Sequence, residues 1–232
     1  MSSPGTPVID TSDLLARFAP FNMLEAAERV RIQAGARPIH AARGELLVQQ
    51  EGCPRGIHLV LGGRIKCFVL SPSGGEKIVR LAEPGTFFGE EAALLNRPHL
   101  FNAQAMGPSE LLFVPIALLR EAMVSSTPFS VSMSMRLATA SYDLMSTMQV
   151  QFQLSGTQRV AHYLTRLAPD DAERCEIRLD IDKQTIAAQL NLTPETLSRI
   201  LSQLTREGMI QPRGRRGMVL SKLSELRSCA AH

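Results

Sequence analysis

The chain has 232 residues, 44% of them hydrophobic, with 25 basic and 22 acidic side chains. Its apolar stretches are far shorter than the ~20 residues that a membrane-spanning helix needs, and residues 1–10 lack the basic and apolar regions of a signal peptide. We therefore expect a cytoplasmic protein with no membrane partner. Four scattered cysteines without a Cys-x-x-Cys pair argue against a zinc site and against a disulfide framework.

The excess of positive charge lies in the last third of the chain. Residues 1–154 carry 13 basic and 13 acidic side chains, whereas residues 155–232 carry 12 basic and 9 acidic ones. Within residues 183–222 there are 7 basic and 2 acidic side chains. A local excess of this kind favours a polyanionic partner such as nucleic acid.

Short β runs, interrupted by Gly and Pro, dominate residues 43–115. The runs cover residues 45–49, 58–61, 65–70, 77–82 and 110–114, and the turn signals are Gly62-Gly63, residues 71–75 and Pro84-Gly85. Many short strands with this punctuation are typical of a sandwich, barrel or jelly roll.

A long helix is predicted over residues 128–154, which contain no Gly and a single Pro at the start. Apolar side chains recur there at steps of three and four residues, at Met133, Leu137, Ala140 (or Ser141), Leu144 and Met148. A stripe this narrow indicates a coiled-coil seam, so we interpret the segment as a dimerisation helix with Met133, Leu137, Leu144 and Met148 at the seam. A helix that packs on its own domain core is the alternative.

Two short helices, 183–190 and 194–207, are predicted on either side of a three-residue turn. Thr193 can cap the second helix, Pro194 suits its first position, and Leu197, Ile200, Leu201 and Leu204 form its apolar stripe. Strand runs 209–212 and 218–220 follow. This order predicts a winged helix-turn-helix.

The polar face of the second helix carries the chemistry for reading DNA. Glu195, Ser198 and Arg199 share the outer face of its first turns, where a recognition helix meets base edges. Arginine can donate two hydrogen bonds to guanine, and glutamate can accept one from cytosine. The alternative is a Glu–Arg pair on a solvated surface. Contacts to the DNA backbone are predicted for Thr193, Ser202, Arg206 and the wing arginines Arg213, Arg215 and Arg216.

Four motifs follow one another along the chain: Gly62-Gly63-Arg64, Pro84-Gly85-x-x-x-Gly89-Glu90, the long helix that stops before Gly156, and the run L-T-P-E-T-L-S-R at 192–199. Their order and spacing resemble those of the CRP/FNR superfamily of bacterial regulators over nearly the whole chain. The resemblance implies an α+β fold: a jelly-roll effector or sensor domain of the cyclic-nucleotide-binding type (1–127), a dimerisation helix (128–154) and a winged helix-turn-helix (155–232). It also implies a homodimeric transcriptional regulator, not an enzyme, that binds double-stranded DNA. Most regulators of this family are activators that contact RNA polymerase.

The recognition run is similar to the Glu-x-x-Ser-Arg of the FNR and Dnr branches, because Pro194 stands where the cAMP-receptor branch has an arginine. This similarity implies TTGAT-type half-sites in an inverted repeat, read by Glu195, Ser198 and Arg199. Two half-sites should lie about one helical turn apart.

The residues that would hold an effector depart from the cyclic-nucleotide binders of the family. Leu100-Phe101 stand where those proteins place an Arg-Ser or Arg-Thr pair on the phosphate, and Leu144-Met145 replace hydroxyl residues. An apolar wall would leave the phosphate charge uncompensated, so we do not expect cAMP to bind. The expected effector pocket comprises Gly89, Glu90, Leu100, Phe101, Leu144 and Met145.

Two further sensor chemistries follow from the resemblance. An FNR-type iron–sulfur cluster needs N-terminal cysteines, and the first cysteine here is Cys53, so no such cluster is expected. The Dnr-like group responds to nitric oxide through bound haem, which makes haem a candidate cofactor. Leu94, Leu95, Leu100 and Phe101 would form its apolar cavity, and His40, His58 and His99 are the candidate axial ligands.

Other interpretations stay open beside this one. Each histidine can have a structural or surface role instead, and the regulator can sense a small organic effector or no effector. A cyclic-nucleotide-binding signalling module is a further alternative, which Leu100-Phe101 disfavours. A cupin-type enzyme would need an HxH metal motif that the three histidines do not form.

Overall fold

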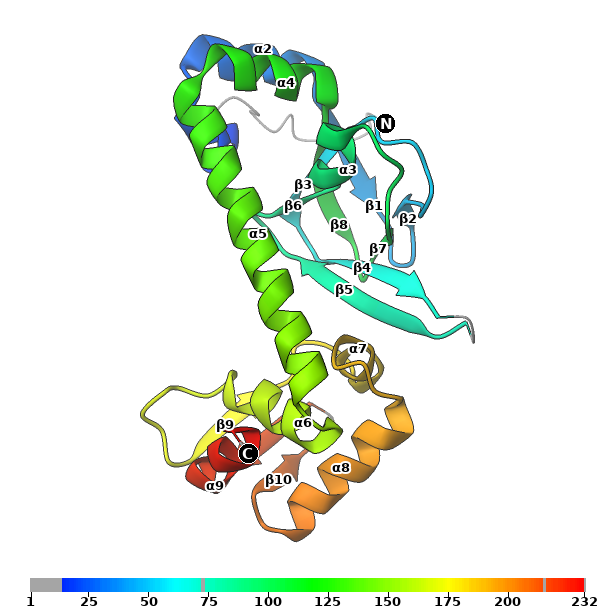
Figure 1. The fold of residues 1–232 in the computed structure, drawn as a ribbon, viewed down its shortest axis with the longest axis vertical. Coiled ribbons are helices and arrows are strands. Elements are labelled where there is room, and N and C mark those ends of the chain that lie inside the picture. The colour runs from blue at the N-terminus through cyan, green and yellow to red at the C-terminus, as the bar shows by residue number, and fades with distance from the viewer. Residues whose placement is uncertain (1–13, 72–73, 215, 232) are drawn as a thin grey trace, which may run out of the picture. The chain divides into compact units, whose positions relative to one another are not determined.

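The computed structural model describes residues 14–71, 74–214 and 216–231 (Figure 1). The chain divides into two compact units. Residues 1–69 and 79–141 form the first, and residues 70–78 and 142–232 form the second.

Eight strands build two four-stranded sheets: β1 (Arg37–Ala41), β2 (Leu46–Val48), β3 (Gly56–Gly62), β4 (Ile65–Leu70), β5 (Glu76–Ala82), β6 (Phe87–Phe88), β7 (Asn102–Ala105) and β8 (Ser109–Pro115). One sheet has the order β1-β8-β3-β6 and the other the order β2-β7-β4-β5. The predicted runs correspond to β2, β3, β4, β5 and β8, and the jelly-roll expectation is confirmed. The sequence patterns missed β1, β6 and β7.

Two clusters of buried apolar side chains stabilise the first unit, and they lie on opposite faces of the β1-β8-β3-β6 sheet. Strand β8 contributes to both clusters. Leu111 packs in the cluster between the sheets, and its neighbour Leu112 packs in the cluster under the helices. Alternate side chains of a strand point to opposite faces, so a strand covered on both faces is apolar throughout. This explains why β8 has apolar side chains at consecutive positions and does not alternate with polar ones.

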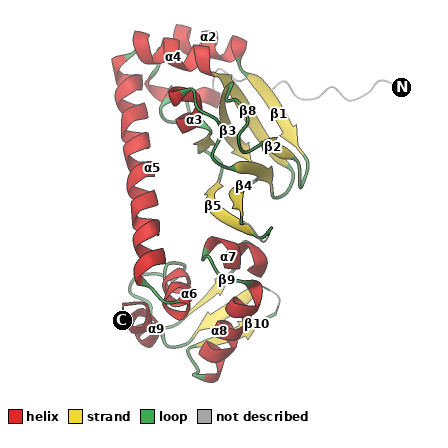
Figure 2. Cartoon of the chain, turned by 45° about the vertical axis from the view of Figure 1, so that its right-hand side comes forward, coloured by secondary structure: helices red, strands yellow, loops and turns green. Residues whose placement is uncertain are grey.

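Helices cover the outer face of that sheet. They are the short 3-10 helix η1 (Phe21–Met23), α2 (Ala26–Gly35), α3 (Glu90–Leu95) and α4 (Ile116–Ser125), and α2 and α4 lie side by side in Figures 1 and 2. Helix α5 spans Thr127–Gln153, where the sequence predicts a helix over 128–154. Its first turns bury Phe129 and Met133 completely in the cluster under the helices.

The burial of Met133 makes part of the predicted dimer seam wrong. Met133 has no exposed surface, and Leu137 is half-buried against the same cluster, so these side chains pack on their own domain. Leu144 and Met148 are exposed and can meet a partner. The alternative of a core-packing helix therefore holds for the first third of α5.

The second unit contains the predicted winged helix-turn-helix. Its elements are α6 (Gly156–Thr165), β9 (Cys175–Arg178), α7 (Lys183–Gln189), α8 (Pro194–Arg206), β10 (Ile210–Arg213), β11 (Gly217–Leu220) and α9 (Leu223–Ala231), with the sheet order β10-β11-β9. A Cβ atom at Gly156 would lie 3.2 Å from Leu192 and 3.4 Å from Ile200. The glycine thus lets α6 approach the helix-turn-helix closely.

Candidate DNA-binding surface and effector cavity

Side-chain caps fix the two helices of the helix-turn-helix. Asp182 Oδ1 accepts a hydrogen bond from the Thr185 N–H (2.8 Å) and caps α7, while Thr193 Oγ1 accepts one from the Thr196 N–H (3.2 Å) and caps α8. Pro194 occupies the first position of α8, as predicted. Each cap satisfies an amide that has no partner within the helix, and it defines where the helix starts.

The apolar stripe of α8 is buried and its polar face is exposed. Leu197, Ile200, Leu201 and Leu204 are all buried, as the sequence predicts. Glu195, Ser198 and Arg199 are exposed together on the other side. Among the residues that the structure describes, Glu195 and Arg199 form no ion pair with each other, which disfavours the surface-pair alternative and leaves both side chains available.

The side chains predicted to contact the DNA backbone surround this face. Arg206 ends α8, and Arg213 and Arg216 are exposed in the β10–β11 hairpin, whose turn contains Gly214 at φ +64°. Arg215 lies outside the described residues. The hydroxyl of Ser202 donates to the Ser198 carbonyl (2.9 Å), and that of Thr193 serves the helix cap, so both are already engaged within the protein.

Leu100 and Phe101, two of the predicted pocket residues, do not face a common cavity. Leu100 is 71% exposed, so it is no wall of a cavity, and Phe101 is buried in the cluster between the sheets. Leu144 and Met145 are exposed on the part of α5 that belongs to the second unit. The prediction was wrong at Leu100 and Phe101, because position counted from Gly89 does not reveal which way a loop turns after α3.

An internal ion pair occupies the Gly89-Glu90 corner. Gly89 adopts φ +87° and starts α3, and the buried Glu90 carboxylate accepts a hydrogen bond from Arg80 (3.2 Å). Arg80 also donates to the Phe87 carbonyl (3.1 Å). Burial raises the pKa of Glu90, while the Arg80 charge opposes that rise. The negative charge of the Glu90 carboxylate is therefore balanced by the Arg80 guanidinium of the same chain.

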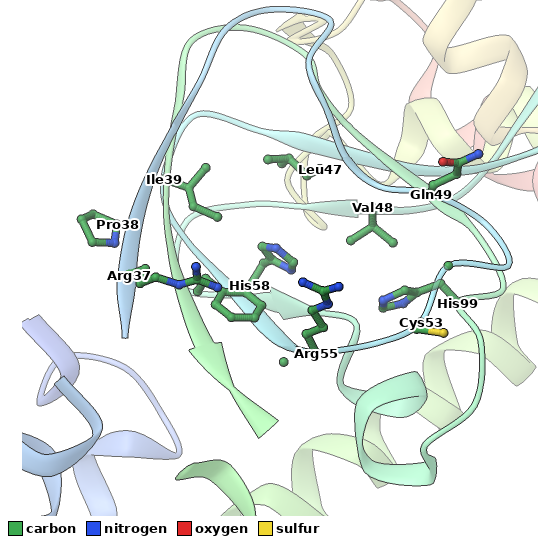
Figure 3. A pocket seen from close by; sticks show the side chains of 13 residues that line it. Arg37, Pro38, Ile39, Leu47, Val48, Gln49, Cys53, Arg55, His58 and His99 are labelled. Carbon is green, nitrogen blue, oxygen red and sulfur yellow. The ribbon is translucent and has the colours of Figure 1, made fainter. Parts of the chain in front are cut away.

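A cavity of about 390 Å³ lies elsewhere in the first unit (Figure 3). Side chains from β1, β2, β3, β8 and the loops line it: Arg37, Pro38, Ile39, Leu47, Val48, Gln49, Gly52, Cys53, Arg55, Gly56, His58, His99 and Phe113. Two of the three candidate haem ligands, His58 and His99, face this space. His40 is exposed on β1 and is not among the lining residues.

Aromatic rings hold the His58 imidazole in place. It stacks on Phe88 at a centroid distance of 5.0 Å and meets Phe113 at 5.1 Å. Burial, with a smaller contribution from His99, lowers the pKa of His58 to about 4. Burial also lowers the pKa of His99. Both imidazoles are therefore neutral near pH 7.

The exposed side of α5 carries an apolar stripe that the sequence analysis missed. Its members follow steps of four and three residues: Val131, Met135, Ala138, Tyr142, Met145, Gln149 and Phe152. Six of these seven side chains are apolar and all seven are exposed. Alternating steps of three and four are the spacing of a coiled-coil seam. The signal was present in the sequence, but a second stripe through Met133 obscured it.

Known proteins resemble both units. Residues 38–126 match the cyclic nucleotide-binding domain family, and residues 158–229 match the Crp-like helix-turn-helix domain family. The regulatory protein HlyX of Actinobacillus pleuropneumoniae is 28% identical over 192 residues, which cover 79% of this chain and 78% of HlyX. The chain belongs to the CRP/FNR family. It is thus a DNA-binding transcriptional regulator with a sensor domain, of a family whose members act as dimers.

Solved structures agree with this membership. A putative cyclic nucleotide binding protein from Ruegeria pomeroyi is 30% identical, with 96% of this chain and 97% of that chain covered and a TM-score of 0.55. FixK2 from Bradyrhizobium japonicum, 23% identical, shares the fold with a TM-score of 0.71 over 85% of this chain and 98% of its own.

Membrane-spanning helices and clusters of metal ligands are both absent from the part of this CRP/FNR chain that the structure describes. None of the helices within the described ranges is long and apolar enough to cross a membrane. In the same ranges, no three or more His, Cys, Asp or Glu side chains gather in a way that would hold a metal ion.

Proposed function

We propose that this regulator binds, as a homodimer, an inverted repeat of TTGAT-type half-sites, with Glu195, Ser198 and Arg199 of each α8 reading the bases. The observation that supports this most is the exposed face of α8, where the three side chains lie together over a fully buried stripe. The recognition helix of a helix-turn-helix presents its N-terminal residues to base edges in the major groove.

Each reader has a base that suits its chemistry. The Arg199 guanidinium can donate two parallel hydrogen bonds to guanine O6 and N7, which is the commonest specific contact in the major groove. The Glu195 carboxylate can accept from cytosine N4 on the other strand. Ser198 is small enough to let the helix approach a thymine methyl group. Together they suit the G·C pair and the flanking thymines of a TTGAT half-site.

Cationic side chains around α8 would hold the phosphates. Arg206, Arg213 and Arg216 are exposed, and we assign them, together with Arg215, to contacts with the DNA backbone, which carry no sequence information directly. We assign Thr193 and Ser202 to the backbone as well: the Thr193 hydroxyl accepts the cap hydrogen bond, and the Ser202 hydroxyl would have to release the Ser198 carbonyl to donate to a phosphate.

The dimer is proposed to form through the exposed stripe of α5. Pairing two such helices would bury Val131, Met135, Tyr142, Met145 and Phe152, which are between 57% and 78% exposed in the single chain. The single polar member, Gln149, would lie at the seam, and a polar side chain there fixes register and partner number at some cost in stability. A two-fold dimer suits an inverted repeat.

The direction of regulation is proposed from the family resemblance. RNA polymerase contact is typical of CRP/FNR regulators, and we propose that this chain activates transcription in the same way. In vitro transcription from a promoter with an upstream TTGAT repeat tests the sign. More transcript on addition of the protein supports activation, and less contradicts it.

The experiment that tests the readers measures DNA affinity by fluorescence anisotropy on the inverted TTGAT repeat and on versions with each base pair changed. Arg199→Ala should weaken binding to the repeat by about 1–3 kcal/mol and should remove the preference at the guanine. Arg166→Ala, an exposed arginine at the end of α6, is the matched control. Equal affinity for all sequences before and after Arg199→Ala would refute the assignment.

Haem with nitric oxide is the effector that the Dnr-like resemblance predicts. His58 and His99 are the side chains that would hold its iron, and neutral imidazole is the ligating form. The apolar wall expected for it does not form, because Leu95 and Leu100 are 65% and 71% exposed. The absorption spectrum of the protein after haem reconstitution decides the matter: a Soret band that shifts with nitric oxide supports haem, and a featureless spectrum removes it.

A further inference from the structure

The cavity that contains His58 and His99 has the composition of an anion site. Its 13 lining residues include Arg37 and Arg55 but no aspartate or glutamate. Both arginines are exposed and neither has an ion-pair partner among the described residues, although the Arg37 guanidinium lies 5.0 Å from the Phe113 ring centroid. Charges that are unpaired at the edge of a concave site are available to a ligand.

Two buried nitrogen atoms in the same cavity have no hydrogen-bond partner within the described part of the chain. They are Nδ1 of His58 and Nδ1 of His99, in residues that are only 8% and 5% exposed. Most buried polar atoms are paired, because leaving one unpaired costs free energy. Figure 3 shows the side chains of Arg55, His58 and His99 directed into the same space. A ligand with polar oxygens would supply the missing partners.

The His58 ring and the His99 backbone are held in position before any ligand binds. His58 is fixed by the rings of Phe88 and Phe113. The backbone of His99 is tied to the 51–52 turn, since its N–H donates to the Gly52 carbonyl (3.1 Å) and its carbonyl accepts from the Glu51 N–H (2.8 Å). Groups that are ordered in advance lose less entropy on binding.

The rest of the lining sets the shape and polarity of the occupant. Ile39, Leu47 and Val48 give one side of the cavity an apolar surface. The volume of about 390 Å³ is in the range of small-molecule sites. Because the two imidazoles are neutral, they can exchange hydrogen bonds with a ligand while the arginines supply the charge.

We propose that this cavity binds a small organic anion, whose carboxylate or phosphate pairs with Arg55 and Arg37 and whose oxygens bond to Nδ1 of His58 and His99, and that this anion is the effector of the regulator. The apolar body of the ligand contacts Ile39, Leu47 and Val48. The effector role rests on the proposed function, whereas the binding site itself does not.

Isothermal titration calorimetry on the full-length protein tests the site with three probes of similar shape. Benzoate carries a carboxylate, phenyl phosphate carries a phosphate, and benzamide is the neutral control. At least one anion should bind in the micromolar to millimolar range, and benzamide should bind at least about tenfold more weakly. Whether the carboxylate or the phosphate binds better identifies the anionic group.

Single substitutions test whether the anion binds in this cavity. Arg55→Gln should weaken anion binding at least about tenfold, whereas Arg43→Gln, an exposed arginine that does not line the cavity, should leave it unchanged. His99→Gln should weaken binding as well. Absence of binding by both anions, equal binding to Arg55→Gln, or haem uptake that His58→Gln abolishes would each overturn the site.

Anisotropy on the TTGAT repeat, with and without the bound anion, separates the two proposals. A change in DNA affinity that Arg55→Gln removes supports the effector role. Anion binding with no change in DNA affinity overturns that role and keeps the site. Failure to bind the repeat specifically under both conditions contradicts the proposed function, and the calorimetric result on the cavity still stands.

Discussion

The imidazole of His58 lies between the rings of Phe88 and Phe113, where burial lowers its pKa to about 4 from an ordinary 6.5. The unfolded chain therefore takes up a proton before the folded chain does as the pH falls. Stability from this group is fully present above about pH 6.5 and is lost between about 6.5 and 4. The full difference corresponds to about 3 kcal/mol.

Urea unfolding at several pH values from about 7.5 down to about 4 would measure this loss. His58→Gln should reduce the decrease in unfolding free energy over that window, because the variant has no imidazole to protonate. His40→Gln, at an exposed position on β1, is the control and should retain the decrease. An identical pH dependence in wild type and His58→Gln would contradict the prediction.

Single residues also show where sequence reasoning succeeds and fails. The exposure of Glu195, Ser198 and Arg199 follows from helical periodicity alone, since four apolar side chains fix which face is buried. Leu100 fails because it lies in the loop after α3, where no periodicity exists and chain direction depends on long-range contacts. The backbone bonds that join His99 to residues 51 and 52 are such contacts, across 47 or more positions, and no local pattern encodes them.

At the scale of elements, α5 carries two apolar stripes with similar spacing. One passes through Met133 and Leu137 and packs on the first unit, and the other runs from Val131 to Phe152 on the exposed side. The sequence contains both periodicities, and periodicity alone cannot say which stripe faces the helix's own domain. Only the positions of the sheet and of α2 and α4 decide that.

This division of α5 predicts opposite effects for two methionines. Met145→Lys places a charge on the exposed stripe of each helix, so the dimer should dissociate, with little change in the core of the first unit. Met133→Ala leaves a hole in a fully buried cluster and should cost about 2–5 kcal/mol of unfolding free energy while the dimer persists.

Analytical ultracentrifugation and urea unfolding on both variants separate these effects. Thr147→Lys, an exposed position on another side of α5, is the matched charge control and should remain dimeric. If Met133→Ala dissociated the dimer and Met145→Lys did not, the seam would be the one that the sequence pattern first suggested.

At the scale of the whole molecule, the charge is distributed so that function divides along the chain. Residues 1–154 carry no net charge, whereas the segment 183–222 has an excess of five basic side chains. The field of that segment attracts any DNA, and the face of α8 selects among sequences. Non-specific and specific binding should therefore respond to different substitutions.

The salt dependence of DNA binding tests this division. The double variant Arg213→Gln, Arg216→Gln removes two wing cations from each chain and thus four from a dimer. The slope of log K against log salt should fall in magnitude by about 0.9 for each phosphate that these arginines no longer neutralise. Affinity should fall alike for the TTGAT repeat and for unrelated DNA, because phosphates carry no sequence information.

Arg43→Gln in the first unit, which removes one cation from each chain outside the wing, serves as the control and should leave the slope unchanged. Arg199→Ala gives the complementary pattern, a weakening confined to sequences that keep the guanine. If the wing variant weakened binding to the repeat alone, with an unaltered slope, the hairpin arginines would be reading bases. The recognition surface would then extend beyond α8 to β10 and β11, and the selectivity of the regulator would depend on both elements.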